Sequence, residues 1–314
     1  MGKLIVRRLL LTIPLLFVVS LIVFGLAKLV PGDPAVTIAG ENATIERIEQ
    51  IRDRLGENDP AIVQYGRLIK GVFTGDLGTS LYSEQKVTDA ITTALPVTLS
   101  LAGLALLFVV LFGVSFGLLA GSRPGSLADR VLTVLAALGV AAPGYWVGII
   151  LIIVFGLNLG WFPTGLYVKI TEDPLNWLYH LALPAFALSL AGIVEVTRQL
   201  RGSLRDTMQQ DYVRTARAKG LSGRLVILKH ALKNAAIPVV TVIGLQVNAL
   251  LGGAIALELV FGFSGVGALA IRAVVNRDLP IIQGIVLMSV FVVTISNLLV
   301  DLAYGWLNPK VRAQ

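Results

Sequence analysis

The stretch DYVRTARAKGLSGRLVILKHALKNAAIP, residues 211–238, is a long polar run between two strongly hydrophobic segments. From Arg198 to Lys233 the chain carries nine lysines or arginines against two acidic residues. Loops with such an excess of positive charge stay on the cytoplasmic side when the neighbouring segments cross a membrane. Residues 198–236, called the basic loop below, therefore predict both the membrane character of the chain and its orientation.

The first part of the basic loop predicts a short helix. Residues 212–219 contain no helix breaker, and Gly220 is a residue at which helices commonly end. Ala216 and Gly220 stand four residues apart, so they share one side of a helical projection. Because neither has a bulky side chain, we expect this side to lie close against a partner protein. A solvated charged loop is the alternative.

The composition differs from that of soluble globular proteins. Of 314 residues, 55% are hydrophobic and only 14% are charged, which indicates an all-α integral membrane protein. The net charge of +7 is not accompanied by aromatic residues interleaved with basic patches, so nucleic-acid binding is not expected. The chain has no cysteine and only two histidines, His180 and His230. No spacing of residues predicts a metal site.

Six apolar segments are long enough to cross a membrane as helices, because about 20 residues at about 1.5 Å each span a hydrocarbon core of roughly 30 Å. They are residues 9–30, 98–120, 131–157, 177–196, 235–257 and 281–302. A cleaved signal peptide is the competing interpretation of the first segment. Its apolar run is longer than that of a signal peptide, and no cleavage site follows it. Gly113 and Gly117 in the second span have a spacing that can bring helices together.

The distribution of charge supports six spans with both termini in the cytoplasm. In this arrangement the internal segments hold 16 lysines or arginines and the external segments hold nine. Acidic residues run the other way, with three inside and fourteen outside. An odd number of spans would place Lys310 and Arg312 outside, against the positive-inside rule.

The segment after the first span predicts a small external helical cap, residues 31–97. It separates residues 1–30, with the first span, from a core transmembrane domain of residues 98–314. Apolar residues repeat at helical spacing in residues 41–55, and a second helix is expected to begin at residues 59–60, with Asp as its N-cap and Pro in its first position. The cap either packs only on the membrane domain or also contacts a partner that delivers a substrate.

A few polar or kinked positions are candidates for lining a pathway through the membrane. Gln246 and Asn248 are uncharged polar residues inside the fifth span, where facing lipid is unfavourable, so we expect them to point inward. Pro143 is expected to bend the third span, and Tyr145 lies beside it. Residues 258–280 are too polar and glycine-rich to cross the membrane and predict an external, re-entrant scoop.

The sequence contains no recognisable chemistry for powering transport. It has no G-x-x-x-x-G-K-[ST] phosphate motif, no H-E-x-x-H zinc motif and no G-x-S-x-G nucleophile motif. Ion-coupled carriers usually keep carboxylates near the membrane midplane. By the span boundaries above, Glu195, Glu258 and Asp301 all fall near interfaces. The energy is therefore expected to come from another chain, and this chain is not expected to be an enzyme.

Residues 211–222, DYVRTARAKGLS, resemble the cytoplasmic loop signature of binding-protein-dependent ABC importer permeases. The family pattern is E-A-A-x-x-x-G, then nine residues, then I-x-L-P. Here Arg214-Thr215-Ala216 stands at the E-A-A place, Gly220 keeps the glycine, and residues 230–233, HALK, replace I-x-L-P. This departure is the form of the dipeptide, oligopeptide and nickel branch, in which the chain is similar to the first permease subunit.

Four other stretches extend the resemblance along nearly the whole chain: LVPGDP at 29–34, GDLG at 75–78, NRDLP at 276–280 and LNPKVR at 307–312. The resemblance implies the six-helix fold of type I importer permeases and a bacterial inner-membrane location. It also implies three kinds of partner: a second homologous permease, two cytoplasmic ATPase subunits that would hold ATP and Mg, and an external substrate-binding protein. The residues that it implies for coupling to the ATPase are Arg214, Thr215, Ala216, Arg217 and Gly220.

The resemblance implies import of dipeptides or oligopeptides by alternating access, with movement of the coupling helices opening the cavity to one side and then the other. Import of nickel or another small solute is the alternative within the same importer class. A stand-alone secondary carrier is the alternative from another class, and it would move solute in liposomes without ATPase subunits. No catalytic group of residues supports a membrane enzyme.

Overall fold

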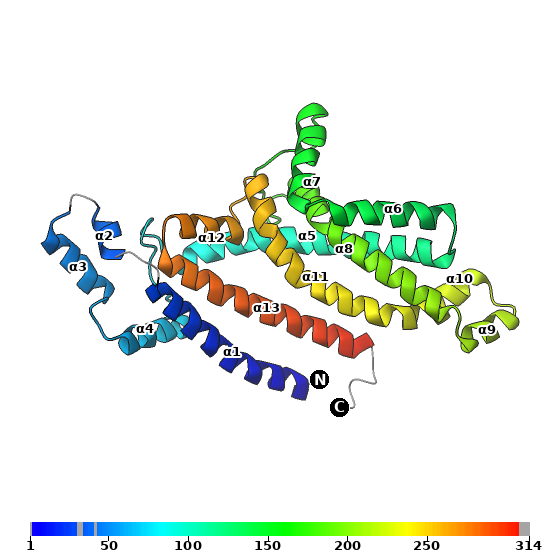
Figure 1. Ribbon diagram of the computed structural model, residues 1–314, viewed down its shortest axis with the longest axis horizontal. Helices are drawn as coiled ribbons and strands as arrows, with labels where there is room; N and C mark the ends of the chain where they lie inside the picture. The colour runs from blue at the N-terminus through cyan, green and yellow to red at the C-terminus, as the bar shows by residue number, and fades with distance from the viewer. Residues whose placement is uncertain (1, 30–33, 41–42, 308–314) are drawn as a thin grey trace. The chain divides into compact units, whose positions relative to one another are not determined.

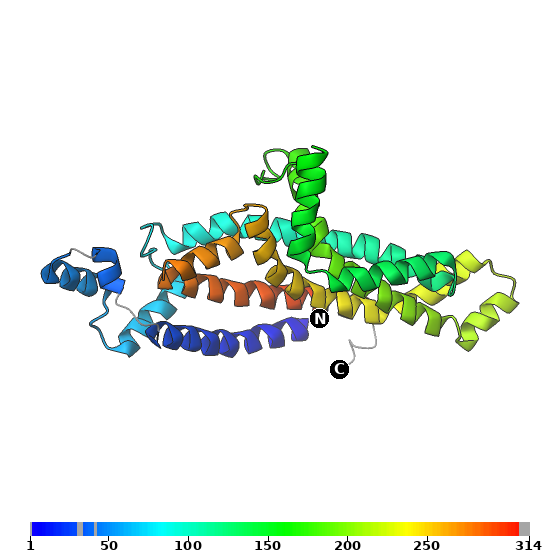
Figure 2. The same cartoon turned by 45° about the horizontal axis from the view of Figure 1, so that its top comes forward.

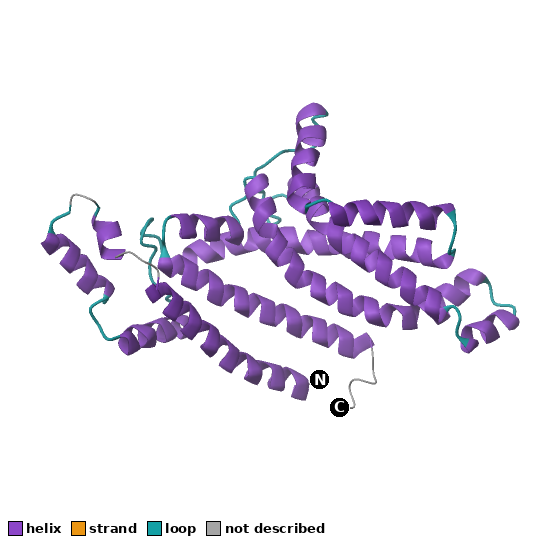
Figure 3. Ribbon diagram, viewed as in Figure 1, coloured by secondary structure: helices purple, strands orange, loops and turns teal. Residues whose placement is uncertain are grey.

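The computed structural model describes residues 2–29, 34–40 and 43–307, and within these ranges the chain is helical with no strand (Figure 1, Figure 3). Two elements, η1 and η2, are π-helices, which contain more residues per turn than an α-helix. In chain order the elements are α1 Gly2–Leu29, α2 Pro34–Ala39, α3 Ile45–Leu55, α4 Ala61–Thr74, α5 Val87–Ser122, α6 Leu127–Ala141, α7 Gly144–Leu151, η1 Ile152–Asn158, α8 Pro174–Thr207, α9 Asp211–Ala218, α10 Gly223–Leu225, η2 Val226–Ala231, α11 Leu232–Val260, α12 Val266–Val275 and α13 Leu279–Leu307.

The described residues include five helical stretches that are long and apolar enough to cross a membrane: Thr12–Leu29, Val87–Ser122, Pro174–Thr207, Gly223–Val260 and Leu279–Val300. They correspond to the predicted first, second, fourth, fifth and sixth spans, and the expected all-helical membrane fold is confirmed. The second helix is longer than predicted, because α5 begins at Val87 and continues through Pro96. The last residues of the predicted cap therefore belong to α5.

The third predicted span is interrupted rather than bent. Helix α6 ends at Ala141, Ala142 has an extended backbone, and α7 begins at Gly144 with Pro143 as its N-cap. A proline disfavours helical backbone in the residue before it and has no N–H to donate, so both effects act at Ala142 and Pro143. Helix α7 turns away from the direction of α6 (Figure 1, Figure 2).

Two compact units make up the chain. One contains Val97–Gly267 and the described residues from Ser296 onward, and the other contains Gly2–Pro96 and Ala268–Ile295. The boundary at Val97 is close to the predicted start of the core domain. Most of α12 and the first part of α13, by contrast, group with the N-terminal residues.

Helices α5, α8 and α11 form the core of the first unit, and α6 also packs along α8 (Figure 2). Close approach of α5 and α8 depends on Gly113 and Gly117. A Cβ atom at Gly113 would lie 2.8 Å from Val196, and one at Gly117 would lie 2.8 Å from Leu200. The predicted packing role of this glycine pair is confirmed.

In the second unit, α4 packs on α1 through Tyr65. The Tyr65 hydroxyl is 2.9 Å from the Ser20 hydroxyl, and its ring makes edge contacts with Phe17 and Phe24. Helix α4 begins at Ala61 with Pro60 as the N-cap residue, so Pro60 is one position earlier than predicted. Asp59 does not cap the helix but forms an ion pair with Arg67.

The same unit brings two distant sequence motifs together. Asp278, in the NRDLP stretch, is buried and accepts hydrogen bonds from the Ser80 hydroxyl and from the N–H of Leu81. These residues follow the GDLG stretch, in which Gly78 N–H donates to Asp76. The turn before α13 is thus fastened to the loop before α5.

Candidate functional site

The basic loop is shorter than predicted, because residues 198–207 continue α8 and residues 232–236 begin α11. The residues between these two helices form α9, α10 and η2 (Figure 1). Helix α9 is amphipathic. Val213 and Ala216 pack on Val226 of η2, with Met208 and Leu221 at the edge of this small cluster. The residues of and next to α9 that remain exposed are Asp211, Tyr212, Arg214, Thr215, Arg217, Ala218, Lys219 and Gly220. The loop therefore has its own apolar core and presents a mainly basic outer face.

Ala216 does not lie on that outer face. Its side chain is only 7% exposed and contacts the cluster with Val213 and Val226. Our expectation that Ala216 and Gly220 together form a close-approach surface for a partner therefore does not hold for Ala216. Among the predicted coupling residues, the exposed ones are Arg214, Thr215, Arg217 and Gly220.

Gly220 ends α9 in a left-handed conformation, with a φ angle of +79°. Its N–H donates to the Arg217 carbonyl at 2.9 Å, and the next N–H, of Leu221, donates to the Ala216 carbonyl at 3.4 Å. No atom lies within 4 Å of the place that a Cβ atom would take at Gly220. Glycine is thus favoured here by backbone conformation rather than by lack of space.

A hydrogen bond links α9 to α11. The Asn234 amide in the first turn of α11 donates to the Tyr212 hydroxyl at 2.8 Å. With the Val213–Val226 contact, this bond ties the basic outer face to the helix that carries Gln246 and Asn248.

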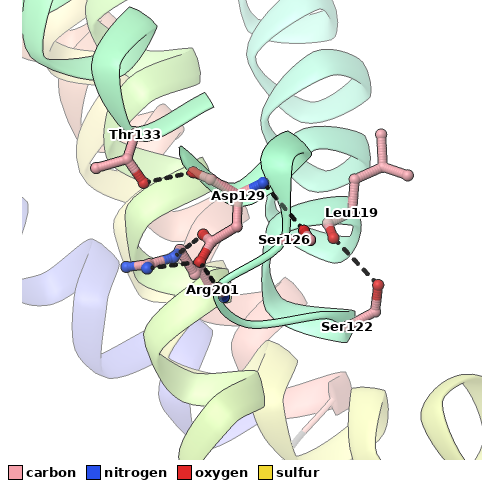
Figure 4. Close-up of polar contacts among 7 residues, drawn as sticks. Leu119, Ser122, Ser126, Asp129, Thr133 and Arg201 are labelled. Carbon is pink, nitrogen blue, oxygen red and sulfur yellow. Dashed lines mark hydrogen bonds and ion pairs between the residues drawn. The ribbon is translucent and has the colours of Figure 1, made fainter. Parts of the chain in front are cut away.

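An ion pair fastens the last part of α8, which holds the first residues of the basic loop, to the start of α6 (Figure 4). Two guanidinium nitrogens of Arg201, Nε and Nη2, donate to the carboxylate of Asp129, which is 3% exposed. The N–H of Gly125 also donates to this carboxylate, at 2.9 Å. The Arg201 hydrogen bond and, after it, the Gly125 hydrogen bond hold the pKa of Asp129 below its usual range.

The four candidate pathway residues have different surroundings. Pro143 caps α7, and Tyr145 is half exposed on the same helix. Gln246 is buried, and its amide donates to the Glu195 carboxylate of α8 at 2.5 Å. Asn248 donates to Asn297 of α13 at 3.2 Å. Gln246 points inward as predicted, but no hydrogen bond joins these residues into one group in the described part of the chain.

Two carboxylates have surroundings that differ from the prediction. Gln246 is the middle residue of α11, Leu232–Val260, and its partner Glu195 lies inside the membrane-length helix α8, Pro174–Thr207, rather than at the end of a span. Glu258, expected in a polar external segment, is 0% exposed near the end of α11. It accepts a 2.5 Å hydrogen bond from Thr98 of α5, whose hydroxyl in turn accepts from the N–H of Val266.

Comparison with known proteins decides the family. A family model described as "Binding-protein-dependent transport system inner membrane component" matches residues 113–313, and a model for the N-terminal part of such membrane components matches residues 1–102. The chain belongs to this family. It is therefore a multi-pass inner-membrane component of a transport system, and the resemblance described from its motifs is confirmed.

Relatives match this membrane component along its full length. A putative peptide transport system permease protein of Brucella abortus (strain 2308) is 41% identical over 312 residues, covering 99% of each chain. The dipeptide transport system permease protein DppB of Alkalihalophilus pseudofirmus is 38% identical over 326 residues, covering 98% of each chain. An inward-facing structure of the MetNI methionine ABC transporter has the same fold, with a TM-score of 0.55 and 14% identity over 70% of this chain and 96% of that chain.

Sequence reasoning missed three contacts of this transport-system membrane component: Asp129 with Arg201, Tyr212 with Asn234, and Glu195 with Gln246. The partners in each pair are at least 20 residues apart in the chain, so no helical spacing reveals them. The one available signal was the polarity of Glu195 and Gln246 within apolar spans, because polar groups at membrane depth need partners.

Proposed function

We propose that this chain is the permease subunit of an ATP-driven importer of dipeptides or oligopeptides and forms half of its translocation pathway. Full-length similarity to relatives whose names denote peptide and dipeptide transport supports this substrate class. The other half is a second, homologous permease. Two ATP-binding cassette subunits hold ATP and Mg, and an extracytoplasmic binding protein delivers the substrate. The chain itself catalyses no reaction.

The observation that carries the coupling role is the exposed basic face of α9 on its own apolar support. Arg214, Thr215 and Arg217 point outward, while Val213 packs on Val226. Such a face suits an acidic groove on an ATPase subunit, because its arginines can form charge-assisted hydrogen bonds with carboxylates. Since Tyr212 is bonded to Asn234, displacement of α9 by the ATPase would also pull on α11.

The orientation follows from charge. With both termini in the cytoplasm, the basic loop of residues 198–236 is also cytoplasmic and can reach ATPase subunits. Alternation between inward-open and outward-open states is then driven by movement of the two coupling helices.

A stand-alone carrier is the alternative function. A lack of carboxylates within the spans does not argue against such a carrier, because Glu195 lies inside α8 and bonds to Gln246 in the middle of α11. The chain's membership of a family of binding-protein-dependent transport systems is the reason to prefer an importer subunit over a stand-alone carrier.

The proposal is tested by reconstituting the permease pair, the ATPase subunits and the binding protein in proteoliposomes. We expect peptide uptake that requires ATP, and we expect the double variant Arg214→Glu, Arg217→Glu to reduce uptake at least tenfold, because each removed charge-assisted contact is worth roughly 1.5–3 kcal/mol. Membrane insertion of the chain should be unchanged.

Arg224→Glu is the matched control, since Arg224 is exposed in the same loop but lies on α10. Uptake that persists without ATPase subunits would identify a carrier. Normal ATP-dependent uptake in the double variant would refute the docking role of α9.

A further inference from the structure

Glu195 is an exposed carboxylate within the first unit's membrane helices. Its side chain lies on the surface of α8, and its contact with Gln246, the middle residue of α11, places it well away from the ends of both helices. An ionised carboxylate facing lipid inside a span is unfavourable by several kcal/mol. The Glu195 surface of α8 therefore faces protein or a water-filled path in the assembled transporter.

The structure holds the Glu195 carboxylate in place without neutralising it. Gln246 donates one amide hydrogen to Oε2 of Glu195 at 2.5 Å. The Gln246 amide is itself packed tightly, because a Cβ atom at Gly192 would lie 3.0 Å from its Oε1 and 2.6 Å from Val109. Gly192 thus makes the room in which Gln246 reaches Glu195.

No cation of the described chain neutralises Glu195. Arg198 is the nearest charged residue along α8 and is also exposed, yet no ion pair within 4.0 Å joins the two in the described residues. The other hydrogen-bonding capacity of the carboxylate is therefore available to a cationic group from outside this chain.

We propose that Glu195, positioned by Gln246, binds the terminal ammonium group of the peptide during its passage through the membrane. The inference rests on the function proposed above. The amino terminus is the one cation that dipeptides and oligopeptides share whatever their side chains, so a single carboxylate within the helices can serve all of them. A charge-assisted hydrogen bond between an ammonium group and this carboxylate supplies the recognition.

The experiment compares a peptide that has a free amino terminus with the same peptide N-acetylated, each at a concentration that saturates the binding protein. In the reconstituted complex, Glu195→Gln is expected to lower uptake of the free-amine peptide about tenfold or more, which is the scale of one charge-assisted bond. Uptake of the acetylated peptide is expected to stay unchanged. Glu172→Gln, which removes an exposed carboxylate from a loop, is the charge-matched control.

Gln246→Met tests the positioning role, because methionine has a similar length but no N–H to donate. We expect an intermediate loss of free-amine uptake with the acetylated peptide again unaffected. An equal loss for both peptides in either variant would mean that the residues only pack the helices, and it would overturn the proposal.

A cation of the second permease could occupy the Glu195 site instead. Glu195→Gln would then separate the two permeases during purification, which would also overturn the proposal. If that variant fails to insert, carbodiimide labelling of Glu195 in the wild-type complex decides the question: the free-amine peptide should protect Glu195, and equal labelling with both peptides would refute the site. ATP-dependent uptake by the wild type tests the proposed function separately.

Discussion

Gly265 lies where any side chain would overlap the carboxyl group of Glu258. That carboxyl group is completely buried and accepts the hydroxyl hydrogen of Thr98. A larger residue at position 265 would push Glu258 away from Thr98. The buried carboxyl group would then lose its hydrogen bond to Thr98, and leaving a buried polar group without its partner costs roughly 1–3 kcal/mol.

We therefore expect Gly265→Ala to lower the midpoint of thermal unfolding in detergent by several degrees. Gly252→Ala is the control, because a Cβ atom at this α11 position meets no atom within 4 Å. Equal midpoints for the two variants would contradict the role assigned to Gly265.

At the scale of single residues, the sequence predicted correctly that a polar side chain within a span points inward, but it predicted less well which side of a helix is covered by a neighbouring helix. It indicated that Gln246 points inward, but it placed Ala216 on an outer face when Val226 covers it. Ala216 and Val226 lie on different helices, so a helical projection of α9 alone does not show which side its neighbour covers.

Among the elements, α6 and α8 are joined by the pair Asp129–Arg201 in addition to their packing. The pKa of Asp129 is lower in the folded protein than in the unfolded chain because of the Arg201 and Gly125 hydrogen bonds. The pair therefore contributes its full stability above the usual Asp pKa of about 4. The contribution is lost as the pH falls through the lowered pKa.

We expect Asp129→Asn to unfold at a lower temperature than the wild type at pH 7, and the difference to shrink as the pH falls below about 4. Thermal unfolding across this pH range measures it. Asp206→Asn, at an exposed position of α8, should show no such difference. A gap between Asp129→Asn and wild type that does not change with pH would argue against the ion pair as its source.

The helices themselves were largely predictable because the apolar segments are long. Five predicted spans correspond to helices of membrane length in the described residues. The third predicted span does not correspond to one helix, because α6 ends at Ala141 and α7 begins at Gly144. The sequence predicted only a bend at Pro143. Whether a proline bends or ends a helix depends on what surrounds the freed backbone groups, and local sequence carries no information on that.

For the whole molecule, the absence of cysteine makes the predicted orientation directly testable. Single cysteines can replace Arg224 in the basic loop and Lys169 in the loop before α8, since both side chains are exposed. If the termini are cytoplasmic, we expect a membrane-impermeant thiol reagent to label Lys169→Cys in intact cells and Arg224→Cys only after lysis. The reverse pattern would invert the topology and exclude α9 as the contact for a cytoplasmic ATPase.

The π-helix η2 has a consequence for how motion at α9 would reach α11. Compared with an α-helix, a π-helical turn accommodates about one additional residue, which corresponds to a rotation of about 100° in the faces of all later residues. Val226 at its start faces α9, and Gln246 further along faces α8. The angle around the helix axis between these two contacts is set by η2. Conversion of η2 into a regular α-helix would therefore rotate Gln246 about the axis of α11 while Val226 kept its contact with α9.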